Sequence, residues 1–161
     1  MNVGEALIIV RQKINDYDEV GLSDEELLHY INEAAQYVSQ YLASSNSPLM
    51  VKEQTLTAQT NVLPANFLKT CGTFPIKITG NVIELLDDPP LKIRYTAGVD
   101  RVSYVDDMPF QHEALNQFIV KLATIYALNQ EELDVSQDKA LLGELQASIA
   151  SAIGAAVVAA Q

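Results

Sequence analysis

The segment from Leu22 to Ser44 has the clearest pattern of hydrophobic and polar positions in the chain. Apolar side chains recur in it at steps of three and four residues, which predicts an amphipathic helix over 23–44. Ser23 and Glu26 have the spacing of a capping box, in which each side chain binds the backbone amide of the other residue. The predicted apolar face consists of Leu27, Ile31, Ala34, Ala35, Val38 and Leu42.

Three tyrosines form a second stripe beside this apolar face: Tyr30, Tyr37 and Tyr41. A helix that is apolar over about half its circumference contacts two partners, so we expect this helix in the middle of a bundle. A tyrosine combines a wide apolar area with a polar tip, which suits protein–protein interfaces. The stripe is therefore either part of the core or a set of candidate subunit contacts.

Three further helices are predicted by the same periodicity. Asn2 and Glu5 offer a cap for the first of them, and Pro109 suits the first turn of the third helix of the chain. The predicted segments are about 2–17, 109–129 and 134–156.

Residues 49–97, between the second and third predicted helices, follow a different pattern. They are rich in β-branched side chains and alternate between apolar and polar positions, as strands do. Gly80 and Asn81 stand between two alternating runs, which predicts a tight hairpin turn. The sequence thus predicts an α+β, mainly α fold: a four-helix bundle interrupted by a small antiparallel β insertion.

Composition favours a single globular domain over residues 1–161, since 48% of the residues are hydrophobic and 19% are charged. The formal net charge is -11, and the ten Lys and Arg residues are scattered singly. Without a basic patch, a firm grip on nucleic acid is not expected. The acidity fits a soluble surface, a basic partner or a surface that repels DNA.

Several classes of protein are excluded by what the sequence lacks. The first residues have no basic region and no cleavage site, so we expect no signal peptide. No run reaches the ~20 strongly apolar residues of a membrane span. Cys71 is the single cysteine, which rules out an internal disulfide and a cysteine-based metal site. We therefore expect no membrane, metal or cofactor, and a cytoplasmic or virion location.

Catalytic patterns are missing as well. Asp16 to Leu27 resembles a calcium loop, but Val20 and Leu27 occupy the fifth and twelfth positions, which need oxygen ligands. The two histidines, His29 and His112, have no second metal ligand at helical spacing. Each acidic pair stands beside a turn or a helix start, where it serves local structure; the pairs are Asp87/Asp88, Asp106/Asp107 and Glu131/Glu132. The sequence predicts no enzyme.

The C-terminal stretch 147–161 is rich in alanine and has no charged side chain. It has few large side chains with which to build a core of its own. It is therefore either a frayed helix end or a segment that orders against another subunit.

The order of these pieces resembles the small head-to-tail adaptor (neck, or connector) proteins of tailed bacteriophages. The resemblance runs from about Val3 to Leu145. It is carried by "LSDEELLHYINEAAQYVS", "NVLPANFLKT", a strand that ends in "IRYTAG", and the C-terminal helix pair "DDMPFQHEALNQFIVKLATIYALNQEELDVSQDKALLGEL".

The resemblance implies a ring of about twelve copies that docks beneath the portal protein of a filled capsid. The ring would extend the DNA channel and carry tail or nozzle proteins, at the head–tail junction of the virion and, during assembly, in the host cytoplasm. It implies helices between neighbours, the β insertion toward tail or portal, and no catalytic residues. The acidity fits a channel through which DNA slides without binding. The candidate portal contacts are Ala155, Ala156, Val157, Val158, Ala159, Ala160 and Gln161.

Two alternatives stay open at this point. One is an acidic DNA mimic or another small soluble protein-binding module. A DNA mimic would need carboxylates spaced along one surface. The other is a cell-wall-cleaving tail enzyme that uses an acidic pair as its general acid and base.

Overall fold

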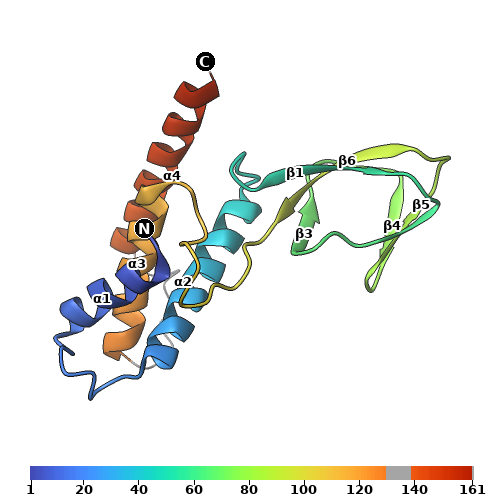
Figure 1. The fold of residues 1–161 in the computed structure, drawn as a ribbon. Helices are drawn as coiled ribbons and strands as arrows, with labels where there is room; N and C mark the ends of the chain where they lie inside the picture. The colour runs from blue at the N-terminus through green and yellow to red at the C-terminus, as the bar shows by residue number, and fades with distance from the viewer. Residues whose placement is uncertain (130–138, 161) are drawn as a thin grey trace. The chain divides into compact units, whose positions relative to one another are not determined.

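The structure, a computed structural model, describes residues 1–129 and 139–160, and gives the backbone alone at 139, 141, 142 and 154–160. Figure 1 shows its helices and strands. In chain order they are α1 (Val3–Ile14), α2 (Asp24–Ser44), β1 (Val51–Leu56), β2 (Thr60–Val62), β3 (Phe67–Thr70), β4 (Ile76–Thr79), β5 (Val82–Leu85), β6 (Leu91–Ala97), α3 (Glu113–Asn129) and α4 (Lys139–Ala160).

Both predicted capping boxes are confirmed. In α1 the Asn2 side chain accepts a hydrogen bond from the Glu5 amide at 2.8 Å, and the Glu5 carboxylate accepts one from the Asn2 amide at 3.0 Å. In α2 the Ser23 hydroxyl accepts from the Glu26 amide at 3.2 Å, and the Glu26 carboxylate accepts from the Ser23 amide at 2.8 Å. Each box satisfies two backbone donors that the first helical turn leaves unpaired.

Two helix boundaries differ from the predicted ones. α1 ends at Ile14, since Asn15 takes a left-handed conformation with φ of 58°. α3 begins at Glu113 rather than at Pro109. The Asn116 side chain accepts from the Phe110 amide at 3.3 Å and donates to the Phe110 carbonyl at 2.7 Å, which keeps the preceding residues out of the helix.

The strands form two antiparallel sheets, with strand orders β1-β6-β3 and β2-β5-β4. The predicted hairpin joins β4 to β5, and Gly80 supplies the positive φ angle of 56° that its turn requires. Ile83 stands opposite Asn61 of β2 and Ile78 of β4, so it lies in the middle of its sheet.

The predicted four-helix bundle with a small β insertion is wrong, because the strands have a hydrophobic core of their own. The buried residues of this core all come from strands of the two sheets: Leu56, Ile83, Leu85, Ile93, Tyr95 and Ala97. Contacts divide the chain into two compact units. We call Met1–Val38 with Asp100–Gln161 the helical unit, and Ser39–Val99, which begins in α2, the β unit.

In the helical unit, α3 packs against both α1 and α4. Figure 1 shows that α1 is short and crosses α3 obliquely, so the helices do not form a parallel bundle. α4 contributes the buried side chains of Leu145 and Ala152 to this unit. In the first part of the alanine-rich stretch, Ala152 is therefore core, whereas Ala147, Ala150 and Ser151 are exposed. Its backbone is helical to Ala160, whereas Gln161 lies outside the described residues.

Replacing Ile83 by alanine should test whether the β unit depends on its own core. Ile83 has no exposed surface, so Ile83→Ala leaves a cavity and should lower the free energy of unfolding by about 3 kcal/mol. Ile78, its neighbour across the hairpin, is 42% exposed, and Ile78→Ala should cost about 1 kcal/mol or less. Urea unfolding followed by circular dichroism measures both values. Equal losses would contradict the assigned core.

Candidate functional site

The three predicted contact tyrosines all lie on α2 and are all half-buried. Tyr30 and Tyr37 belong to the helical unit, and Tyr41 to the part of α2 in the β unit. The rings of Tyr30 and the exposed His29 are 5.9 Å apart. Half-burial leaves each tyrosine with surface for a partner while part of its ring packs within the chain.

Tyr37 is also close to α3. Burial, together with the nearby Tyr37 and Glu33, raises the pKa of Tyr126 to about 12, so its hydroxyl keeps its proton at neutral pH. Glu33 in turn lies 3.8 Å from Arg101 in an exposed ion pair. Tyr37 thus lies near Tyr126 of α3, and all three tyrosines stay candidate subunit contacts.

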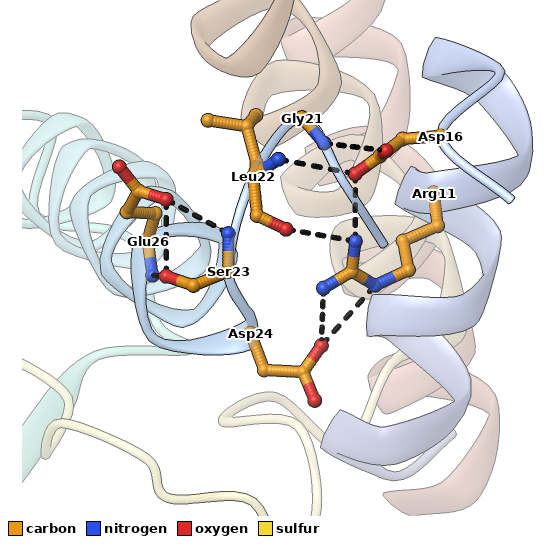
Figure 2. Close-up of polar contacts among 7 residues, drawn as sticks. All are labelled: Arg11, Asp16, Gly21, Leu22, Ser23, Asp24 and Glu26. Carbon is orange, nitrogen blue, oxygen red and sulfur yellow. Dashed lines mark hydrogen bonds and ion pairs between the residues drawn. The ribbon is translucent and has the colours of Figure 1, made fainter. Parts of the chain in front are cut away.

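Arg11 is the centre of the most extensive polar network in the described residues (Figure 2). Its guanidinium donates to the Asp16 carboxylate at 2.7 Å, to the Leu22 carbonyl at 2.9 Å, and to one Asp24 oxygen at 2.6 and 3.1 Å. Arg11 is only 8% exposed, although it is charged. The network joins α1, the connection to α2 and the first residue of α2.

Asp16 closes the connection between the two helices. The Gly21 amide donates to its carboxylate at 2.9 Å and the Leu22 amide at 3.2 Å. These bonds, led by that of Gly21 and joined by the charge of Arg11, hold the pKa of Asp16 below its usual range, although partial burial acts in the opposite direction.

This network explains why the segment resembles a calcium loop without being one. The Asp16 and Asp24 carboxylates and the Leu22 carbonyl converge on a cation, but that cation is the Arg11 guanidinium. The described residues contain no group of three or more His, Cys, Asp and Glu side chains that could hold a metal ion.

The two acidic pairs within the described residues do not have the environment of a general acid. Asp106 accepts from the amide and the hydroxyl of Ser103 at 2.7 and 2.8 Å, and these bonds lower the pKa of Asp106. A general acid needs a raised pKa. Asp87 and Asp88 are exposed. The third pair, Glu131/Glu132, lies outside the described residues.

The sequence did not identify two buried polar side chains, those of Asn32 and Ser39, that bind backbone groups far along the chain. Its pattern assigns Asn32 to the polar side of α2, yet Asn32 is 4% exposed. Its side chain accepts from the Val102 amide at 2.8 Å and donates to the Val102 carbonyl at 3.0 Å. In the β unit, the buried Ser39 hydroxyl accepts from the Val99 amide at 3.2 Å. The sequence shows that Asn32 and Ser39 are polar, but it shows neither that they are buried nor which backbone groups they bind.

Charge is distributed very unequally between the two units. The helical unit has 17 of the 21 acidic residues and five of the ten basic ones, a formal charge of -12. The β unit has four acidic and five basic residues, a formal charge of +1. The acidity of the whole chain is therefore a property of its helical unit.

No protein-family model and no curated protein matches this sequence. In the described part of the chain, no helix is both long enough and apolar enough to cross a membrane.

Replacing Arg11 by alanine should destabilise the helical unit, because two carboxylates would lose the cation they share. Because Asp24 is half exposed, we expect a loss of about 2 kcal/mol, less than for a fully buried pair, and a fall in Tm of about 4–8 °C. The matched control is Lys13→Ala, which removes the same charge from an exposed position of α1 and should change stability by less than about 0.5 kcal/mol. If calorimetry finds similar values for both variants, the network has no special structural role.

Proposed function

We propose that this protein is a non-enzymatic structural protein of a tailed bacteriophage: a head-to-tail adaptor that docks as a ring beneath the capsid portal. About twelve copies would extend the DNA channel and offer the platform for tail attachment. Its partners are the portal protein, tail or nozzle proteins, and further copies of itself. DNA passes through the channel without specific binding.

The order of the elements is the observation that carries this proposal. Within residues 1–129 and 139–160, two helices precede the strands and two helices follow them. The sequence segments that resemble adaptors fall on α2, on β2 and β3, on β6, and on the helix pair α3 and α4, in that order. The resemblance therefore involves both compact units and does not depend on a single motif.

The charge distribution supports a role next to DNA. A channel wall that carries the same sign of charge as phosphate disfavours contact, so that DNA slides past it. With -12 of formal charge in the helical unit and +1 in the β unit, the proposal assigns the channel wall to the helical unit.

A DNA mimic is the less favoured alternative because several carboxylates have a local structural role. Asp16 binds Arg11 and two backbone amides, Glu26 caps α2, and Asp106 binds Ser103. A DNA mimic needs carboxylates that point into solvent at the spacing of DNA phosphates. The carboxylates of Asp16, Glu26 and Asp106 instead bind groups of their own chain.

The adaptor proposal predicts that this chain co-purifies with the affinity-tagged portal protein of the same genome. Deletion of 155–161, the candidate portal contact, should reduce retention at least about tenfold. Circular dichroism should show that the shortened chain stays folded, because the buried Leu145 and Ala152 are kept. If the shortened chain is retained as well as the full chain, residues 155–161 are not part of the portal contact. Failure of the full chain to be retained would contradict the adaptor function.

A further inference from the structure

The outer face of the β1-β6-β3 sheet carries a cluster of charged side chains. Successive residues of a strand point to opposite faces, and in β6 the residues Ile93 and Tyr95 point into the core. Lys92 and Arg94 therefore share the outer face. Glu53 of β1 is opposite Arg94 on that face. We call Lys92, Arg94 and Glu53 the basic face.

The basic face has two cations and one carboxylate, and both cations are open to a partner. The side chains of Lys92 and Arg94 are 63% and 67% exposed, and both bind Glu53, at 2.9 and 2.8 Å. One carboxylate between two cations leaves a net positive charge. Arg94 also retains guanidinium N–H donors, which suit a second carboxylate.

The connection between α1 and α2 has the opposite charge. Residues 16–26 include six carboxylates and no Lys or Arg, and Arg11 balances part of this charge by binding Asp16 and Asp24. Asp18, Glu19 and Glu25 are exposed. Beside them Tyr17 and Val20 are 69% and 85% exposed, which is a large apolar area for a loop surrounded by charge. We call residues 16–20 the acidic loop.

Copies of a chain with a net charge of -11 repel one another unless their contact pairs unlike charges. The basic face and the acidic loop are complementary in sign, and both are exposed in the single chain. We propose that the basic face of one copy docks on the acidic loop of a second copy. This inference builds on the ring of the proposed function and names the chemistry of one contact between its neighbours.

Such a contact is head-to-tail, because the two surfaces that meet are different. Each pair of copies then has one free basic face and one free acidic loop, so further copies add until the ring closes. The acidic loop is suited to docking because Arg11 and Asp16 fix its two ends. Tyr17 supplies an aromatic side chain and the basic face an arginine, two residue types enriched where interface energy is concentrated.

Complementary charge reversals test the proposal. One variant carries Lys92→Glu and Arg94→Glu, and the other carries Asp18→Lys and Glu19→Lys. Each alone brings like charges together in the contact, so self-association in sedimentation velocity should weaken about tenfold or more. In an equimolar mixture each surface again meets its opposite, and association should return. Lys52→Glu with Lys77→Glu is the matched control, because it changes the same amount of charge at exposed positions outside the basic face.

Association of the wild-type chain should also fall in ~1 M salt, where the screening length is about 3 Å. Wild-type protein that stays monomeric at low salt and high concentration overturns the proposal, as do variants that associate like wild type or a mixture that does not recover. Retention by the tagged portal protein is measured separately on the same variants. Portal binding without charge-dependent association would leave the adaptor function standing and refute this contact, and the reverse result would refute the adaptor function alone.

Discussion

The contact between Arg11 and the residues that join α1 to α2 is the interaction on which the helical unit depends most. One guanidinium binds two carboxylates and a carbonyl that lie up to 13 residues away along the chain. A buried cation without these oxygens would be strongly destabilising, and the oxygens without the cation would repel one another. The arrangement fixes where α1 ends and where α2 begins, and it holds the intervening loop at the surface with Tyr17 and Val20 exposed.

Each of the two units has a hydrophobic core of its own. The strands bury their apolar side chains against one another, and α3 buries its own against α1 and α4. Because the charge follows this division, one unit is strongly acidic and the other nearly neutral. In the proposed ring, the acidic unit would face the DNA, and the basic face of the β unit would supply a contact between copies that otherwise repel one another.

Local signals were predictable from the sequence, and pairings over long distances were not. The capping boxes at Asn2 and Ser23 and the hairpin at Gly80 were correctly predicted, because each depends on a few adjacent residues. The two-sheet core was missed, since alternation identifies a strand but not its neighbours. The start of α3 was displaced by a side-chain contact of Asn116, which periodicity does not report.

The candidate site shows the same limit. The tyrosine stripe was recognised from its spacing, and its half-burial agrees with both interpretations that the sequence left open. The closeness of Tyr37 to Tyr126 depends on how the helical unit folds, which the pattern of α2 alone does not contain. The sequence shows that Val20 and Leu27 stand at two ligand positions of the loop that resembles a calcium site, but the role of Arg11 required the folded chain. Asn32 was misplaced because its partner, Val102, is 70 residues away.

The mass of the complex formed with the portal protein of the same genome tests the central claim most directly. Light scattering on a sizing column, after co-expression of the two chains, gives the number of copies bound. The adaptor function requires about one copy of this chain for each portal subunit, because a closed ring must sit on a matching ring. Two separate peaks, or a single copy on the whole portal, would contradict it.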